Sequence, residues 1–264
     1  MKPPTLRHRI EFLGYRVALA VLTSLPEGVA LRLGAGLGWL AGVVLGVRRK
    51  VVRAHLLQAF PDRSRRWRRR LAGASFRHLG RESLATFFLG RLSREEVLDR
   101  TELVGFPPLK EAVERGGGAV LVTAHFGNWE LAGAALALRG IPVDVVAQRQ
   151  RNPLFHAELT RSRTELGVNV ILRGEALRKG LKSLRKGRAL AILGDQNLRR
   201  GGVFVDFLGK KASTARGAAV FALRVGSPMF FGVNQRLPGY PSRYRTEILP
   251  VAFTPTGDLE ADAV

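Results

Sequence analysis

The alternation of short apolar runs with helix-like segments beyond residue 100 constrains the fold of this chain more than any other feature. Such runs, rich in β-branched side chains, are typical of buried strands and occur at Ala119–Thr123, Val143–Ala147, Val168–Leu172, Ala189–Leu193, Val203–Phe207 and Met229–Asn234. Helix-like segments lie between most of them, at Trp129–Arg139, Pro153–Leu166, Glu175–Lys186 and Thr214–Val225. This βαβ rhythm predicts an α/β fold in which helices cover a mixed, largely parallel sheet.

The segment from Ala119 to Leu138 holds the strongest candidate for an active site, since a predicted strand leads there into a predicted helix. His125 and Glu130 are five residues apart, and on one continuous helix they would point roughly 140° away from each other. The spacing therefore predicts His125 in the loop and Glu130 in the first helical turn, with Asn128 as the N-cap. A histidine beside a carboxylate can act as a general base with an orienting partner. The alternative is a capped helix with an incidental loop histidine.

Further polar residues follow other predicted strands. Arg149 and Asn152 come after one strand, and Asp195 and Gln196 come after another. Active sites of α/β sheets collect at the C-terminal ends of the strands, so we expect these residues on the same edge as His125. The polar loops of any α/β protein would produce a similar layout, which remains the alternative.

Several chemistries lack their sequence signatures. The chain has no cysteine, which excludes disulfides and thiolate metal sites. No glycine-rich phosphate loop or serine nucleophile elbow follows a strand, and no histidine pair has zinc-ligand spacing. We therefore expect neither a metal nor a cofactor. His78 and Glu82 form a rival acid–base pair, but that spacing on a helix is more often an ordinary polar pair.

The charge balance is strongly basic, with 43 Lys and Arg against 21 Asp and Glu and a formal net charge of +22. Such an excess faces nucleic acid, acidic lipid headgroups or an acidic protein. No helix-turn-helix or aromatic RNA-binding signature supports nucleic acid. The arginine-rich run from Arg63 to Arg70 surrounds Trp67 and follows an apolar stretch, which suits an anionic membrane interface. The ordinary alternative for such a run is a solvated helix face.

Residues 1–50 differ from the remainder and predict a membrane-associated hairpin or anchor. The runs Val17–Leu25 and Leu33–Val47 carry no charge, but a spanning helix needs about 20 apolar residues, so the second run is short unless Arg32 snorkels. No signal-peptide cleavage site follows. Residues 51–264 are expected to form the main domain, with the basic residues after Val47 on the cytoplasmic side.

A stripe of glycines runs through the second of these apolar runs. The glycines recur at every fourth position and are Gly34, Gly38, Gly42 and Gly46. On one helix they would form a smooth face that permits close contact with another helix, in membranes especially. The alternative is a glycine-rich helix inside a soluble core.

Several blocks in consistent order, over roughly residues 10–250, resemble the lipid A biosynthesis late acyltransferases of the lauroyl/myristoyl type, within the lysophospholipid acyltransferase superfamily. The central block, His125 to Glu130, matches the H-x-x-x-x-[DE] motif of that superfamily. The other blocks are Leu56–Pro61, Arg149, Asn152–Leu154, Arg161, Arg163, Gly194–Gln196, Gly202–Gly209 and Ala212–Gly217.

The resemblance implies transfer of an acyl chain from an acyl-carrier-protein thioester to a hydroxyl of a lipid A precursor, at the cytoplasmic side of the inner membrane. His125 would be the general base and Glu130 would orient it. The residues expected to bind substrate are Gly127, Asn128, Arg149, Asn152, Arg163, Asp195 and Gln196. Arginines such as Arg149, Arg161 and Arg163 suit the phosphates of lipid A precursors, although Arg161 also fits a solvated helix position. The oxyanion donor is Arg163, Arg149 or a turn N–H near Gly127.

Some positions depart from the family pattern. His55 stands where the family usually has Asn, and Gln148 stands where it often has Tyr. The chain ends near Leu259–Val264, before the Trp- and Arg-rich segment that such enzymes usually carry, so we expect either a shorter relative or an incomplete sequence. These departures leave the acceptor open. Rival interpretations are acylation of another glycolipid, such as a phosphatidylinositol mannoside or an ornithine- or sugar-linked lipid, and a non-catalytic basic membrane-binding protein.

Overall fold

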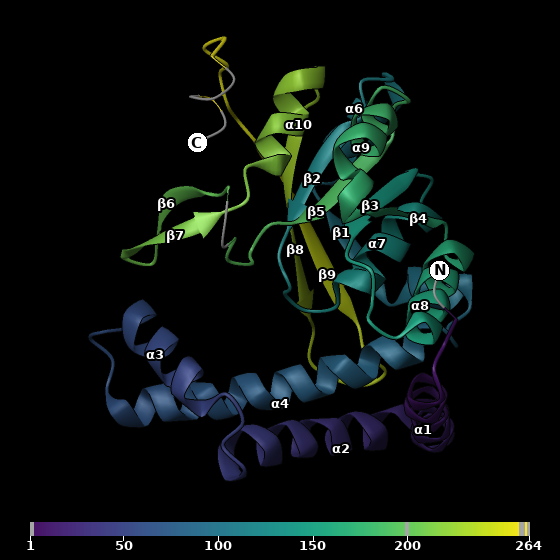
Figure 1. Ribbon diagram of the computed structural model, residues 1–264, viewed down its shortest axis with the longest axis vertical. Coiled ribbons are helices and arrows are strands. Elements are labelled where there is room, and N and C mark those ends of the chain that lie inside the picture. The colour runs from purple at the N-terminus through teal and green to yellow at the C-terminus, as the bar shows by residue number, and fades with distance from the viewer. Residues whose placement is uncertain (1–2, 199–200, 259–261, 263–264) are drawn as a thin grey trace. The chain divides into compact units, whose positions relative to one another are not determined.

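The computed structural model of this chain describes residues 3–198, 201–258 and 262 (Figure 1). The end of the chain from residue 259, to which the expectation of a shorter relative or an incomplete sequence refers, lies outside the described residues apart from residue 262. The contacts divide the chain into two compact units. The first comprises Met1–Val17, Leu92–Val203 and Ser213–Val264, and the second comprises Ala18–Arg91 and Phe204–Ala212.

The first unit is built on a seven-stranded sheet with the order β1-β9-β8-β2-β5-β3-β4. Its strands are β1 (Thr101–Val104), β2 (Ala119–Thr123), β3 (Val143–Ala147), β4 (Val168–Leu172), β5 (Ala189–Leu193), β8 (Met229–Arg236) and β9 (Tyr244–Val251). Every neighbouring pair is parallel except β8 and β9, which are antiparallel. The predicted mixed, largely parallel sheet is confirmed.

Helices cover both faces of this sheet, and side chains alternate between the faces along each strand. Leu121 of β2 joins one buried cluster with residues of α6 (Phe106–Glu114) and α7 (Trp129–Leu138). Val120, its neighbour, joins the opposite cluster with residues of α9 (Ala176–Leu184) and α10 (Gly217–Val225). The unit also contains α5 (Arg94–Asp99), α8 (Pro153–Glu165) and the 3-10 turn η2 (Arg173–Glu175).

The predicted strand at Val203–Phe207 forms, but it does not join the main sheet. As β6 it pairs only with β7 (Lys210–Thr214) in a two-stranded sheet. Strands β1 and β9 were not predicted, because charged residues interrupt them. Arg245 and Glu247 lie within β9, and Glu102 lies within β1, where Arg245 donates a 3.0 Å hydrogen bond to it. Pairing between these strands stabilises segments whose charged residues hide them from a reading of local sequence.

A polar network around the buried Asp144 links β3, β4 and the start of β5 at one end. Arg188 donates two hydrogen bonds to Asp144, of 3.0 and 2.7 Å, and Asn169 donates a third of 2.9 Å. Burial alone would raise the pKa of the Asp144 carboxyl, but the hydrogen bonds from Arg188 and Asn169 outweigh it and lower that pKa below its usual value. Asp144 therefore stays ionised at neutral pH and stabilises the paired strand ends.

The second unit is helical apart from Phe204–Ala212, which belong to the β6–β7 hairpin. It contains α2 (Glu27–Trp39), the π-helical turn η1 (Leu40–Val44), α3 (Arg49–Ala59) and α4 (Arg65–Leu89). Helix α1 (Leu6–Ser24) crosses from the first unit into the second. Helix α2 lies along α4 over most of its length. Contacts among α2, α3 and α4 therefore join residues 18–91 into one unit.

Glycines let the backbones of α2 and α4 approach each other directly. A Cβ atom added to Gly38 would lie 2.1 Å from the carbonyl oxygen of Phe76, and one added to Gly80 would lie 2.1 Å from the carbonyl oxygen of Gly34. The predicted close helix contact is therefore confirmed for Gly34, Gly38 and Gly42. The prediction was wrong for Gly46, because the chain leaves the helix there with a left-handed φ of 72°.

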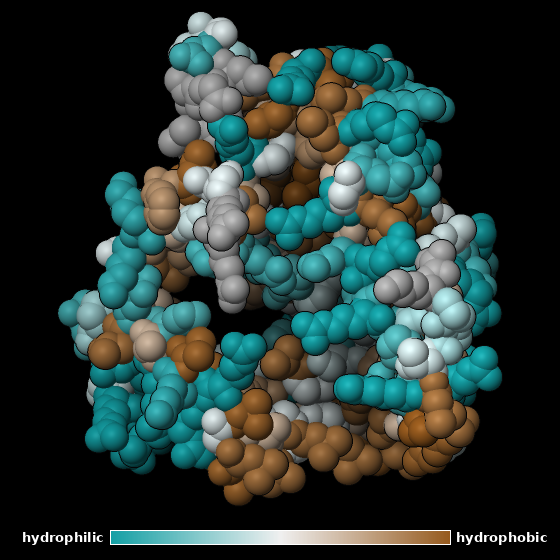
Figure 2. Space-filling view, viewed as in Figure 1, coloured by the Kyte–Doolittle hydropathy of each residue, from teal (hydrophilic) through white to brown (hydrophobic). Residues whose placement is uncertain are grey.

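One stretch among the described residues, Glu27–Val44, is long and apolar enough to cross a membrane. Its outward side carries the exposed side chains Leu33, Leu37, Leu40 and Val44. Apolar side chains gather over α2 in the space-filling view (Figure 2). The predicted apolar N-terminal helix is therefore present. Its glycine face packs against α4, and the face with these exposed side chains is not covered by other described residues.

Two alanine substitutions in α2 are expected to change stability in opposite directions. Gly38→Ala places its Cβ against backbone atoms of α4 that cannot rotate away, so it should lower the free energy of unfolding by about 1–3 kcal/mol. Gly36→Ala meets no atom within 4 Å and should raise that free energy by about 0.5–1 kcal/mol, since alanine favours the helix. Thermal unfolding in detergent measures both changes. Shifts of the same sign in the two variants would contradict the proposed packing.

Candidate active site

The register of two neighbouring parallel strands brings His125 and Asp195 together. Thr123 of β2 pairs with Leu193 of β5, and each candidate residue lies two positions beyond that pair. The Nδ1 atom of His125 lies 2.7 Å from Oδ1 of Asp195, and the backbone N–H of His125 donates a 2.9 Å hydrogen bond to Oδ2. Residues 70 positions apart are therefore held by two contacts at the C-terminal edge of the sheet.

This contact orients the imidazole of His125. Because a carboxylate only accepts hydrogen bonds, the neutral imidazole carries its proton on Nδ1 in this contact and has its lone pair on Nε2. The side-chain nitrogen of Gln196 lies 3.4 Å from Nε2, and the ring of Trp129 meets the imidazole edge to face at 4.9 Å. The His125 side chain remains 35% exposed. An oriented, accessible imidazole of this kind can remove a proton from a bound hydroxyl.

Glu130 has a different partner from the expected one. It lies in the first turn of α7, as predicted, but its two carboxylate oxygens accept hydrogen bonds of 2.8 and 2.5 Å from Arg163 of α8. Both side chains are largely buried, at 13% and 17% exposed. The prediction that Glu130 accepts a hydrogen bond from His125 was therefore wrong, because Asp195 takes that position and Glu130 turns toward α8.

Asn234 of β8, which was not predicted as a site residue, holds the turn between His125 and α7. Gly127 has a left-handed φ of 60°, and a Cβ there would lie 2.0 Å from the carbonyl oxygen of Asn234 in β8. The backbone N–H of Asn128 donates to the Asn234 side chain at 2.8 Å, and Asn234 donates to Thr246 at 2.8 Å. The polar residue in an otherwise apolar strand run, Asn234, was the available signal.

The predicted N-cap role of Asn128 is confirmed. Its side chain accepts a 3.1 Å hydrogen bond from the backbone N–H of Leu131, in the first turn of α7. Asn128 is buried, so it fixes the start of the helix that carries Glu130. Gly127 and Asn128 therefore shape the backbone beside His125.

Asn152 and Arg149 occupy different surroundings. Asn152 is buried and caps α8, and its amide donates a 2.9 Å hydrogen bond to the carbonyl oxygen of His8. A hydrogen bond from Arg7 is the main cause that lowers the pKa of Glu11 below its usual value, and Asn152 adds to that effect. Arg149 is exposed at the end of β3. Within the described ranges, no hydrogen bond or ion pair joins either residue to His125.

Arg161 behaves as an exposed helix residue. It forms ion pairs with Glu158 at 3.0 Å and Glu165 at 3.7 Å on its own helix. His78 and Glu82, the rival acid–base pair, lie 3.9 Å apart on α4 in the second unit. Over residues 3–198, 201–258 and 262, no three His, Asp or Glu side chains gather as a metal site requires.

Comparisons with known proteins identify the family of this chain. The sequence matches the family described as bacterial lipid A biosynthesis acyltransferase over residues 2–263. It is 27% identical to a lipid A biosynthesis lauroyltransferase of Escherichia coli K12 over 97% of this chain and 84% of that protein. It is 28% identical to the palmitoleoyltransferase of the same organism over 90% of this chain and 78% of that protein.

Another relative, whose name gives a different acceptor, has about the same sequence identity to this chain. The phosphatidylinositol mannoside acyltransferase of Mycolicibacterium smegmatis is 27% identical over 161 residues, which cover 60% of this chain and 52% of that protein. The chain thus matches about half the length of this relative.

Proposed function

Because this chain belongs to the bacterial lipid A biosynthesis acyltransferase family, we propose that it moves a fatty acyl chain from an acyl-carrier-protein thioester to a hydroxyl of a lipid A precursor. The observation that carries the proposal is the oriented imidazole of His125, held by Asp195 at the C-terminal edge of the sheet. The reaction takes place at the cytoplasmic side of the inner membrane, where the carrier protein is available.

The proposed step is a direct transfer. Nε2 of His125 takes the proton of the acceptor hydroxyl while the hydroxyl oxygen attacks the thioester carbonyl carbon. The carbon–sulfur bond then breaks, the acyl chain stays on the acceptor oxygen, and the leaving thiolate takes the proton back from the imidazolium. Asp195 stabilises that imidazolium through the 2.7 Å contact with Nδ1. No nucleophile of the enzyme is acylated, which agrees with a chain that contains no cysteine.

Glu130 and Arg163 support this step as a rigid pair. Their bidentate contact joins the start of α7, immediately after the His125 loop, to α8. Arg163 uses Nε and one Nη for this pair, and its other guanidinium hydrogens can face the substrate. The oxyanion of the tetrahedral intermediate is stabilised by Arg163, by Arg149 or by a backbone N–H of the Gly127 turn.

A second acceptor class is favoured by one observation, the similarity to the phosphatidylinositol mannoside acyltransferase. The same His125–Asp195 chemistry would serve any glycolipid hydroxyl. Purified protein incubated with acyl carrier protein loaded with a labelled acyl chain, followed by mass spectrometry of the lipid products, decides between the acceptors. Acylation of a mannoside lipid without acylation of a lipid A precursor would replace the first proposal by the second.

The donor is expected to show a strong salt dependence. An acidic carrier protein is attracted to this basic chain by exposed charges, and the Debye length falls from about 10 Å at 0.1 M salt to about 3 Å at 1 M. The KM for acyl carrier protein should rise steeply over that range while kcat changes little. The matched comparison is the coenzyme A thioester, which lacks the protein surface and should lose less. A salt-independent KM, or equal use of both donors throughout, would remove the carrier from the proposal.

A further inference from the structure

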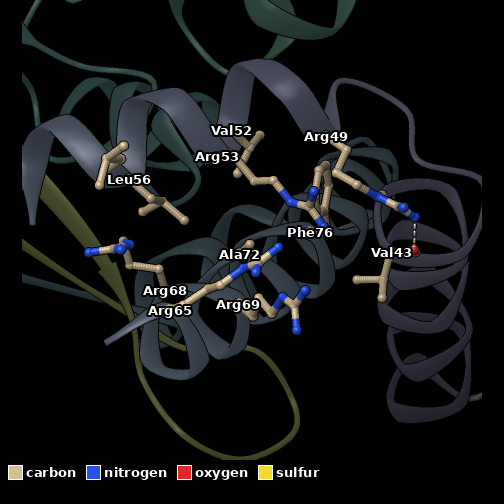
Figure 3. A pocket seen from close by; sticks show the side chains of 12 residues that line it. Val43, Arg49, Val52, Arg53, Leu56, Arg65, Arg68, Arg69, Ala72 and Phe76 are labelled. Atoms are coloured by element: carbon tan, nitrogen blue, oxygen red, sulfur yellow. Dashed lines mark hydrogen bonds between the residues drawn. The ribbon is translucent and has the colours of Figure 1, made fainter. Parts of the chain in front are cut away.

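A pocket with a volume of about 390 Å³ lies within the second unit, between α3, α4 and η1 (Figure 3). Its size falls in the range of small-molecule sites in proteins. The residues that line it are Gly42, Val43, Arg49, Val52, Arg53, Leu56, Leu57, Arg65, Arg68, Arg69, Ala72 and Phe76. They combine an apolar surface with arginines and include no acidic side chain.

The pocket arises from helical periodicity on two helices that face each other. The lining positions of α3 and of α4 recur at spacings of three and four residues, which place them on one side of each helix. Figure 3 shows arginine side chains of both helices directed into the space between them. Although α3 has a clear apolar side, none of its residues is fully buried. That apolar side therefore lacks the protein cover that an amphipathic helix ordinarily has.

Two of the arginines maintain the walls of the pocket. Arg49 donates hydrogen bonds to the carbonyl oxygens of Val43 and Val44, at the end of the π-helical turn. Arg68 donates 3.0 Å hydrogen bonds to the carbonyl oxygens of Phe60 and Pro61, in the loop between α3 and α4. These guanidinium groups satisfy backbone carbonyls that the helix ends leave open. They tie α3 to the π-helical turn and α4 to the loop that follows α3.

The other three arginines have no such partner. In the portion of the chain that the structure describes, no hydrogen bond or ion pair joins Arg53, Arg65 or Arg69 to another group. Three positive charges around one cavity repel one another, and the N-terminal end of α4 adds positive potential beside Arg65. An anion that receives hydrogen bonds from all three would remove this repulsion, and planar guanidinium groups match a phosphate in particular.

The apolar side chains that line the pocket, called its floor below, indicate the chemistry of the part of the ligand that is not phosphate. Val43, Val52, Leu56 and Phe76 present apolar surface below the arginines, which a bare phosphate would leave exposed to water. The pocket wall also includes Gly42 and Val43, which belong to the stretch that is long and apolar enough to cross a membrane. A ligand that carries a phosphate next to a hydrocarbon chain, as membrane lipids do, satisfies both surfaces at once.

We propose that this pocket is a binding site for an anionic glycerophospholipid, with its phosphate on Arg53, Arg65 and Arg69 and part of an acyl chain on the apolar floor. The site is separate from the chemistry of His125 and does not rest on the proposed acyl transfer. It anchors α3 and α4 on an anionic leaflet through one specific lipid, in addition to general attraction by the basic surface.

The test uses matched pairs of arginines on α4. Arg65→Gln with Arg69→Gln removes two charges from the pocket, and Arg66→Gln with Arg70→Gln removes two exposed charges one position along the same helix. The probes are dihexanoyl phosphatidylglycerol as monomers, dihexanoyl phosphatidylcholine and inorganic phosphate, measured by calorimetry on the full chain in detergent. The pocket pair should lose phosphatidylglycerol binding by at least ~10-fold, and the control pair should change it by less than about 2-fold.

A third variant separates the acyl chain from the headgroup. Ala72→Phe enlarges a small lining residue into the apolar part of the pocket without a change in charge, so it should abolish phosphatidylglycerol binding while folding and phosphate binding persist. Equal loss in the two arginine pairs would show diffuse charge and overturn the proposal. Phosphate that binds as tightly as the lipid, or an unaffected Ala72→Phe variant, would show a bare phosphate site and also overturn it. If the pocket pair kept lipid binding but lost an acidic carrier protein, the surface would be a protein dock and the proposal would be wrong.

Discussion

Replacing His125 by alanine is expected to lower the turnover of acyl transfer at least ~100-fold, the usual scale for the loss of a general base. The side chain is 35% exposed, and its removal leaves no buried group without a partner, so the fold should persist. The measurement is kcat of the purified variant with saturating acyl donor. His55→Ala, on the exposed side of α3, is the matched control and should keep kcat within a few-fold of the wild type.

The same variant distinguishes the enzyme from a non-catalytic membrane-binding protein. Vesicle binding should be unchanged in His125→Ala, because no arginine of the basic surface is altered. Activity within a few-fold of the wild type would remove His125 from the proposed mechanism. Loss of vesicle binding together with activity would instead indicate that the substitution had damaged the fold.

Two carboxylates near His125 are expected to respond differently to an amide substitution. Asp195→Asn removes the acceptor of the Nδ1 proton, so kcat should fall at least ~100-fold while KM stays within a few-fold. Because the Asp195 side chain is 37% exposed, the melting temperature should change little. Glu130→Gln breaks a largely buried pair and leaves the Arg163 charge uncompensated, which should lower the free energy of unfolding by about 3–5 kcal/mol.

Unfolding followed by calorimetry or fluorescence measures the loss of stability, and donor kinetics measures the loss of activity. Together they separate the orienting role of Asp195 from the structural role of Glu130. A double-mutant cycle of Glu130→Gln and Arg163→Gln should return a coupling free energy of about 0.5–3 kcal/mol, as expected for groups in direct contact. If Asp195→Asn left kcat unchanged while Glu130→Gln abolished activity at constant stability, Glu130 would be the group that acts through His125. That result would restore the assignment made from sequence spacing alone.

Local sequence was sufficient for the parts of the fold that depend on short-range physics. The apolar runs at β2, β3, β4 and β5 predicted those strands with the bounds observed, because a strand covered on both faces of a parallel sheet is largely apolar. The N-cap at Asn128 was also predictable, since it involves groups within a few residues. The two edge-side strands β1 and β9 were not, because their stability comes from pairing across the sheet.

The glycine stripe shows the same division. Its spacing predicted a smooth helical face, but only the packing of α2 on α4 shows that Gly80 completes the contact. The turn geometry at Gly46 likewise depends on where the helix ends, which the spacing of glycines does not record. The arginines around the pocket show this division too, since Arg49 pairs with carbonyls of the π-helical turn and Arg68 pairs with carbonyls of the loop between α3 and α4, and both pairings depend on the folded backbone.

The sequence by itself determined that His125 lies in a strand–helix loop and that Glu130 begins the following helix. It also placed Asp195 and Gln196 after another strand of the same sheet. Which carboxylate faces the imidazole was decided only by tertiary structure. The β2–β5 register sets His125 opposite Asp195, while the packing of α8 on the sheet delivers Arg163 to Glu130. Both choices depend on contacts between segments far apart in the chain, and a spacing motif contains no information about such contacts.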